Sequence, residues 1–175
     1  KFPANFQLVC ALNPSPCGQF DGSLANCRST PDQILKYLNK LSGPLLDRID
    51  IQVAVPRETS SLRLDGTQVT GETSEQMKQR VIAARQQQYR RQGCLNSELK
   101  ASEVVSHCML TDADHEFLIT AIEKLKLSHR AYHRTLRLAR SIADLDNQKK
   151  VQKPHLAEAM GYRALDQLID QVRSL

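Results

Sequence analysis

One stretch of sequence constrains the fold of this chain more than any other feature. It is a glycine–proline turn followed by two leucines, a lone arginine and an apolar run. Residues 42–50 read Ser-Gly-Pro-Leu-Leu-Asp-Arg-Ile-Asp, and the apolar run 51–55 follows directly. This order predicts a loop, a short helical turn and then a buried strand over residues 49–55, closed by Pro56. Arg48 is then expected where the chain passes the edge of a domain.

Arg48 allows two interpretations. It stands close to two carboxylates, Asp47 and Asp50, and a surface ion pair with either would contribute little stability in water. The alternative is an arginine finger, which reaches into the nucleotide site of an adjacent subunit and stabilises charge on the phosphoryl group being transferred. Composition alone favours the ion pair, whereas the neighbouring sequence favours the finger.

A second apolar run, residues 6–12, ends at Asn13 and Pro14. A continuous run of this length, closed by proline, predicts a strand buried on both faces, as in a parallel sheet. In α/β folds, polar side chains just past the end of such a strand contact ligands. Asn13 is therefore a candidate ligand contact, and the alternative is that it only starts a turn before proline.

The chain divides at a polar stretch, residues 57–72, which contains two glycines. Residues 1–56 predict the end of an α/β core, with a helix over residues 31–41 that Thr30 caps. Residues 73–175 predict helices, because capping signals and apolar stripes recur along them. We therefore expect an α/β part followed by an all-α domain, joined by a linker over residues 57–72. The helices expected in the second part span residues 73–91, 102–108, 112–125, 128–145, 154–160 and 165–172.

The helix expected over residues 128–145 carries an apolar stripe beside a row of arginines. Arg130, Arg134 and Arg137 are spaced i, i+4, i+7, so their side chains should follow one another along one side of the helix. Such a row is commonly a solvated basic face. It could instead contact phosphate, because the planar guanidinium fork matches phosphate oxygens.

Charge and composition limit the classes of partner. The net charge is +5 and the pI is near 9.0, which makes a nucleic-acid partner plausible without demonstrating one. Few aromatic residues and no tryptophan argue against a stacking platform for single strands. No apolar run approaches the roughly 20 residues that span a bilayer, so no membrane partner is expected. Five irregularly spaced cysteines suit a reduced cytoplasmic protein better than a disulfide scaffold.

Several blocks of sequence together resemble a known family. Asn13-Pro14, Gly18 and residues 42–50 are followed, in the same order as in that family, by residues 127–134 and 140–145. The chain resembles the AAA+ ATPases of the magnesium-chelatase and MCM clade, and most of all the ComM/YifB branch. The resemblance covers nearly the whole chain. It implies that residues 1–56 end the ATPase core and that residues 73–175 form the C-terminal lid.

The resemblance also implies roles for three residues. Asn13 would be the sensor-1 residue that orients the attacking water, Arg48 the finger that acts on the neighbour's nucleotide, and Arg130 the sensor-2 arginine. Arg134 and Arg137 stay ambiguous between surface charge and a subunit contact. The cofactors would be ATP and Mg²⁺, and the partners identical subunits in a ring, expected as a hexamer.

The implied activity is that of an ATP-driven motor that moves branched DNA intermediates during transformation and recombination. One alternative is a chelatase-like ATPase that remodels a partner protein for metal insertion. Another is a lid that serves only as an assembly module, without catalysis.

No G-x-x-x-x-G-K-[ST] loop occurs in the sequence, and no apolar run ends in an Asp-Glu pair that could hold magnesium. We therefore expect a C-terminal fragment of a longer ATPase, inactive alone, with ATP and Mg²⁺ bound mainly by an upstream half. Relatives in the resembled branch often carry four cysteines where this chain has Ser15, Cys17, Cys27 and Ser29. Two thiolates do not fill a tetrahedral zinc site, so no metal is expected there, and the five histidines are expected to be non-ligands.

Overall fold

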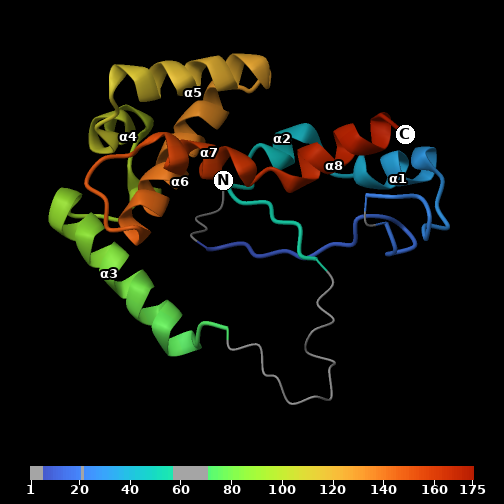
Figure 1. Ribbon diagram of the computed structural model, residues 1–175, viewed down its shortest axis with the longest axis horizontal. Helices are drawn as coiled ribbons and strands as arrows, with labels where there is room; N and C mark the ends of the chain where they lie inside the picture. Colours follow the sequence, from blue (N-terminus) through green and yellow to red (C-terminus); the bar gives the residue numbers. More distant parts are fainter. Residues whose placement is uncertain (1–5, 21, 57–70) are drawn as a thin grey trace. The chain divides into compact units, whose positions relative to one another are not determined.

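The computed structural model describes residues 6–20, 22–56 and 71–175. The chain separates into two compact units (Figure 1). Unit 1 combines Lys1–Leu46 with Ala164–Leu175, and unit 2 comprises Asp47–Arg163. Among the described residues, no helix is both long and apolar enough to cross a bilayer.

Unit 1 joins the two ends of the sequence. Helix α1 (Pro31–Leu38) packs against α8 (Ala164–Arg173), and the short helix α2 (Gly43–Leu46) contributes its last leucine to the same core. Thr30 caps α1 as predicted: its hydroxyl accepts a hydrogen bond from the Gln33 amide at 3.3 Å. The buried core residues are Phe20, Ile34, Leu38, Leu46, Leu165 and Val172.

Unit 2 is a bundle of helices around α6 (His129–Leu145), whose neighbours come from both sides of it in the sequence. Helix α3 begins after a capping box at Thr73 and ends at Gly93, whose φ of 75° is the left-handed conformation that glycine adopts easily. The other elements are α3 (Ser74–Gln92), η2 (Asn96–Glu98), α4 (Ala101–Cys108), α5 (Asp112–Lys124) and α7 (Lys153–Gly161).

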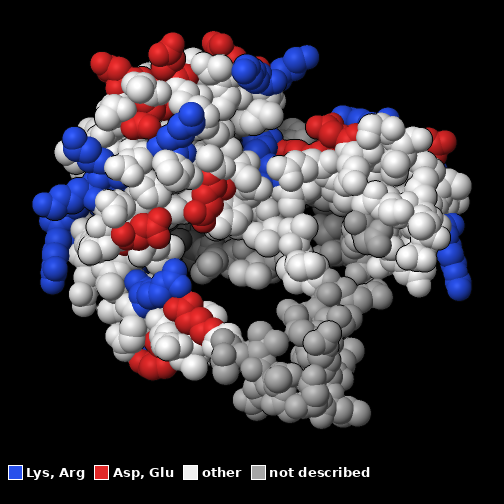
Figure 2. Space-filling model, viewed as in Figure 1, with Lys and Arg blue, Asp and Glu red and all other residues white. Residues whose placement is uncertain are grey.

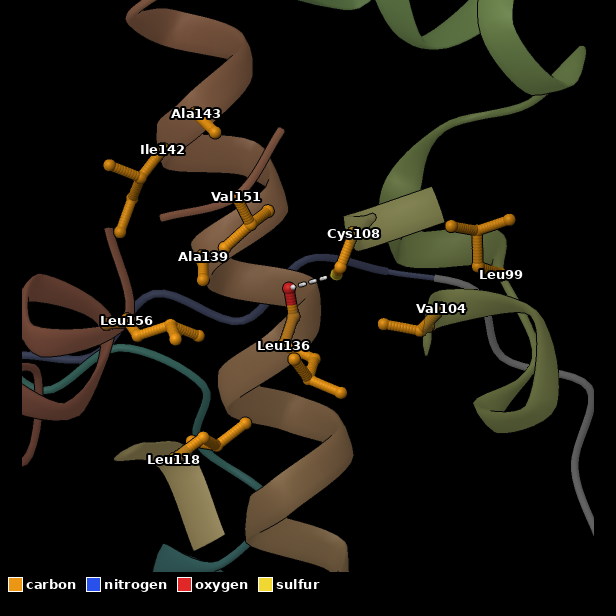
Figure 3. Close-up of a cluster of buried hydrophobic side chains, with 11 residues drawn as sticks. Leu99, Val104, Cys108, Leu118, Leu136, Ala139, Ile142, Ala143, Val151 and Leu156 are labelled. Carbon is orange, nitrogen blue, oxygen red and sulfur yellow. Dashed lines mark hydrogen bonds between the residues drawn. The ribbon is translucent and has the colours of Figure 1, made fainter. Parts of the chain in front are cut away.

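The core of unit 2 forms where α4, α5 and α7 meet α6 (Figure 3). Leu136 and Ala139 of α6 are fully buried there, between Val104 of α4 and Leu156 of α7. The Cys108 thiol lies in the same cluster and donates a hydrogen bond to the Leu136 carbonyl at 3.5 Å. The helical second part of the predicted fold is therefore confirmed.

The structure corrects the prediction of two strands. Residues 6–12 form no strand, and their apolar side chains are exposed: Val9 is 85% exposed. Residues 49–55 contribute only an isolated bridge between Gln52 and Arg163, and Val55 is 87% exposed. A strand needs a neighbour to satisfy its backbone groups. The described residues supply nothing beyond that single bridge, so the α/β part of the predicted fold is absent from them.

One helix boundary in unit 1 differs from the sequence prediction. Helix α1 ends at Leu38 rather than at residue 41, because the amides of Lys40 and Leu41 donate to carbonyls three residues back, as in a turn, instead of four. Residues 57–70 of the expected linker lie outside the described residues.

Candidate functional site

Arg48 lies two residues after the end of α2 and is exposed, and the backbone on either side of it is held by α6. One guanidinium nitrogen of Arg134, Nη1, donates to the Asp47 carbonyl at 2.9 Å and to the Ile49 carbonyl at 3.0 Å. Arg134 itself is only 8% exposed. A charged donor shared by two carbonyls is a strong contact, so the segment that carries Arg48 is fixed to the second turn of α6.

Arg130 lies one turn before Arg134, at the second position of α6, and its side chain is exposed. The helix start is well defined, because the Ser128 hydroxyl accepts a hydrogen bond from the Ala131 amide at 3.2 Å. Arg130 and Arg48 thus belong to one unit, and the first two turns of α6 join them. The sequence alone gave no signal for this link, which depends on residues more than 80 positions apart.

The predicted row of arginines along one exposed side of the helix is wrong. Arg134 turns inward, as described above, and Arg137 Nη2 donates to the Leu99 carbonyl at 2.9 Å. Both side chains therefore donate to backbone carbonyls within unit 2. Of the three predicted arginines in that row, Arg130 alone keeps an exposed side chain.

Asn13 lies in unit 1 and is exposed. Its side chain packs against the turn at Gly18: a Cβ added to Gly18 would lie 3.6 Å from Asn13 Nδ2. The turn is closed by the Gly18 amide, which donates to the Ser15 carbonyl at 3.0 Å, and Gly18 has a φ of 70°. The structure therefore places the Asn13 side chain beside a turn, and its role as a ligand contact stays a prediction.

A buried charge cluster in unit 2 was not predicted. Asp144 accepts hydrogen bonds from Arg140 Nε at 3.1 Å, from Arg91 at 2.6 Å and from Asn96 at 2.9 Å. Arg140 and Asp144 have fully buried side chains. Arg140 also donates to the Lys149 carbonyl at 2.8 Å, so this network joins α3, η2 and α6 to the segment before α7.

Burial by itself raises the pKa of Asp144, but the hydrogen bonds from Arg91 and Asn96 and the positive charge of Arg140 outweigh it and hold that pKa below its usual value. The sequence did contain a signal. Arg140 and Asp144 are spaced i, i+4 among alanines and an isoleucine, which is unusual for a solvated pair. Arg91, in the last turn of α3, supplies the second guanidinium group of the cluster.

Cys17 and Cys27 meet across a loop of unit 1, where their sulfur atoms are 3.1 Å apart. Ser15 Oγ lies 3.3 Å from Cys17 Sγ and also accepts from the Phe20 amide at 3.3 Å. Hydrogen bonds from Ser15, Ser29 and Cys27, and one from the Gln19 backbone, lower the pKa of Cys17 to about 5. Ser15 and Ser29 are both buried, so all four residues that align with the resembled cysteine pattern converge.

The purified protein is expected to contain no zinc. Hydroxyls are poor zinc ligands, so Ser15 and Ser29 leave only the two thiolates of Cys17 and Cys27. In the part of the chain that the structure describes, no group of three or more His, Cys, Asp or Glu side chains could hold a metal ion. Elemental analysis checks this, and stoichiometric zinc would contradict it and require a further ligand.

The described residues match only part of what Mg²⁺-ATP needs. Arg48 and Arg130 are exposed cations of the type that bind phosphate oxygens. The cavity beside Arg134, lined also by Asp50 and Tyr162, has a volume of about 10 Å³ and holds at most one water molecule. The phosphate-binding loop is missing from the sequence, so these arginines fit a supporting role toward a nucleotide held elsewhere.

The surface does not single out a nucleic-acid face. Figure 2 shows basic and acidic side chains interspersed over the face in view. Some of the basic residues are already paired, as Arg80 is with Glu72 at 2.7 Å. On the face in view, the basic side chains of the described residues are therefore not gathered in one band.

The helices of unit 2 are consistent with the C-terminal helical lid that the sequence resemblance implied, and comparison with known families identifies the family of the chain. The family described as magnesium chelatase, subunit ChlI C-terminal, matches residues 71–163, and the family described as magnesium chelatase, subunit ChlI, matches residues 1–62. The chain belongs to the magnesium chelatase family.

Individual relatives match almost every residue of the chain. Competence protein ComM of Haemophilus influenzae is 45% identical over 175 residues, and the uncharacterized protein YifB of Escherichia coli is 44% identical over 174 residues. An uncharacterized protein of Mycobacterium tuberculosis is 36% identical over 167 residues, 93% of this chain. The matched region is 34% of ComM, 34% of YifB and 32% of the mycobacterial protein, so the chain spans about a third of these relatives.

Proposed function

We propose that this chain is the lid and the end of the ATPase core of a longer AAA+ ring motor that moves branched DNA. The observation that carries the proposal is the 45% identity to Competence protein ComM over the whole chain. The name of that relative connects it with competence, in which cells take up DNA. The working state would be a cytoplasmic ring of identical subunits, expected as a hexamer.

In this proposal three residues act on ATP. Asn13 orients the attacking water as the sensor-1 residue, and Arg130 senses the γ-phosphate from the lid. Arg48 is the finger that completes the nucleotide site of the neighbouring subunit. Mg²⁺ and the phosphates are held mainly by residues upstream of this chain, and the ion neutralises charge that develops on the phosphoryl group.

The exposed apolar segments support the proposal that an upstream half of the ATPase core covers them. Residues 6–12 and 51–55 leave large apolar side chains open to solvent, among them Phe6, Val53 and Val55. Exposed apolar rows of this kind normally mark surfaces that another element covers. We propose that residues 6–12 and 49–55 become strands when the rest of the ATPase core supplies their partners, and that residues 57–72 link core to lid.

A second candidate is supported by the family descriptions. Both matched families are named for magnesium chelatase, so a chelatase-like ATPase that remodels a partner protein for metal insertion is the alternative. The two differ in what stimulates hydrolysis. The longer protein should hydrolyse ATP faster when branched DNA is added, and the 175-residue chain alone should hydrolyse none; an ATPase indifferent to DNA would favour the chelatase-like alternative.

Replacement of Arg130 by lysine tests the sensor assignment. Lysine keeps the charge but loses the planar fork, so Arg130→Lys in the longer protein should lower ATP turnover and weaken nucleotide-dependent ring assembly together. The paired measurement is the hydrolysis rate, and the oligomer mass with and without a slowly hydrolysed ATP analogue. Normal values for both measurements would contradict the sensor assignment and show that Arg130 is only a surface charge.

A further inference from the structure

The loop between Cys17 and Cys27 carries a feature that ATP hydrolysis does not use. Its two ends are ten positions apart in sequence, yet the two thiol sulfur atoms lie 3.1 Å apart. Local hydrogen bonds hold both ends: the Gly18 amide donates to the Ser15 carbonyl, and the Cys27 amide donates to the Leu24 carbonyl at 3.1 Å. The two sulfurs are therefore brought together by the fold of the loop, and both remain partly accessible.

The surroundings of the pair favour reaction at Cys17. Donors from Ser15 and Ser29, and the neighbouring thiol, stabilise the thiolate and lower the pKa of Cys17 to about 5. The chain offers a contrast in Cys108, which is buried in the core of unit 2 and whose pKa burial raises to about 12. Since the thiolate is the nucleophile, Cys17 is the reactive member of the pair and Cys108 is inert.

We propose that Cys17 and Cys27 form a reversible disulfide, a modification site for small peroxides that low-molecular-weight thiols reset. The Cys17 thiolate attacks one oxygen of the peroxide, whose O–O bond breaks, giving a sulfenic acid and hydroxide. The Cys27 sulfur then displaces the sulfenic hydroxyl; the S–S bond forms, and the thiol proton leaves with that hydroxyl as water. Two thiols lose two electrons in total, and one peroxide becomes two water molecules.

The cross-link would act on the turn next to Asn13. Cys17 directly precedes Gly18, whose backbone packs against the Asn13 side chain. A disulfide to Cys27 closes the loop covalently and restricts the conformations that this turn can reach. The chemistry of the pair is independent of the proposed DNA motor and holds for a chelatase-like ATPase as well.

The experiment uses the reduced 175-residue chain with Cys10→Ser, in buffer with a metal chelator at about pH 6, where ordinary thiols are almost wholly protonated. The chain is treated with hydrogen peroxide, blocked with N-ethylmaleimide and cut before Asp21, which separates Cys17 from Cys27. Trypsin alone would leave both on one peptide, because no Lys or Arg lies between Lys1 and Arg28. Mass spectrometry should find the two peptides joined, and dithiothreitol should separate them.

Matched variants distinguish the two thiols. Cys27→Ser should stop the reaction at a sulfenic acid on Cys17, which dimedone traps, whereas in Cys17→Ser the trapping at Cys27 should be roughly tenfold slower. Ser15→Ala with Ser29→Ala should move the onset of oxidation to higher pH while circular dichroism shows the helices intact. The proposal is overturned if peroxide oxidises Cys94 as fast as Cys17, if the cross-links join other cysteines or separate chains, or if both thiols are protected by bound zinc.

Discussion

Arg48→Ala in the longer ATPase is expected to abolish nearly all hydrolysis while ATP still binds. Arginine fingers contribute roughly 10³–10⁵ in rate in well-studied phosphoryl-transfer enzymes. The cation acts where charge develops in the transition state, so the affinity for ATP should change by less than about threefold. The measurement is steady-state hydrolysis together with equilibrium binding of a fluorescent ATP analogue.

Two further arginines make this test specific. Arg85 of α3 is an exposed arginine of the same unit, and Arg85→Ala should keep turnover within about twofold. Arg134→Met removes the two hydrogen bonds to the Asp47 and Ile49 carbonyls that hold the Arg48 segment. It should lower turnover by an intermediate amount, because a finger held loosely reaches its target geometry less often. If the Arg48→Ala variant hydrolyses ATP at the normal rate, Arg48 is not an arginine finger and serves only in a surface ion pair.

Asp144→Ala is expected to destabilise unit 2 by about 3–5 kcal/mol, because it leaves the fully buried Arg140 guanidinium without its carboxylate. Arg91 and Asn96 lose the same acceptor. Hydrogen exchange of the α6 amides in the 175-residue chain measures the loss within unit 2. Protection of these amides at the level of the unmodified chain would show that the cluster contributes no net stability.

The control for Asp144 is an exposed pair in the same unit. Glu72 forms an ion pair with Arg80 at 2.7 Å, and their side chains are 33% and 56% exposed, so Glu72→Ala should lower the stability by at most about 1 kcal/mol.

The depressed pKa of Asp144 predicts how the stability of unit 2 depends on pH. Its stabilising contribution is present above the usual carboxyl pKa and is lost as pH falls through the lower folded value. Asp144→Asn should therefore flatten the acid side of the stability profile.

Local signals in the sequence were sufficient for the helices. Thr30 and Thr73 each accept from the amide three residues on, and Gly93 ends α3, because a cap depends on residues within one turn. Strands are different, since their stability depends on partners far away in the sequence. The apolar runs at residues 6–12 and 51–55 have the right composition for strands, but the described residues offer them only the isolated bridge between Gln52 and Arg163.

The candidate site was only partly predictable for the same reason. Arg48 and Arg130 were singled out as individual residues, but their connection through Arg134 depends on contacts across 85 and 87 positions. The side of α6 that carries Arg134 and Arg137 was expected to face solvent or phosphate, and both residues instead satisfy backbone carbonyls. An arginine pattern on a helix does not distinguish these uses, because the acceptors come from other elements.

The measurement that tests the account most directly is ATP hydrolysis by mixed rings of the longer protein. Subunits with Arg48→Ala are mixed in equal amounts with subunits whose own phosphate-binding loop is disabled. If Arg48 acts on the neighbour's nucleotide, an intact loop meets an intact finger at roughly a quarter of the interfaces, and the mixture should recover about that share of the normal rate. A mixture no more active than the two variants measured separately would contradict a finger acting between subunits, and with it the proposed place of this chain in an ATPase ring.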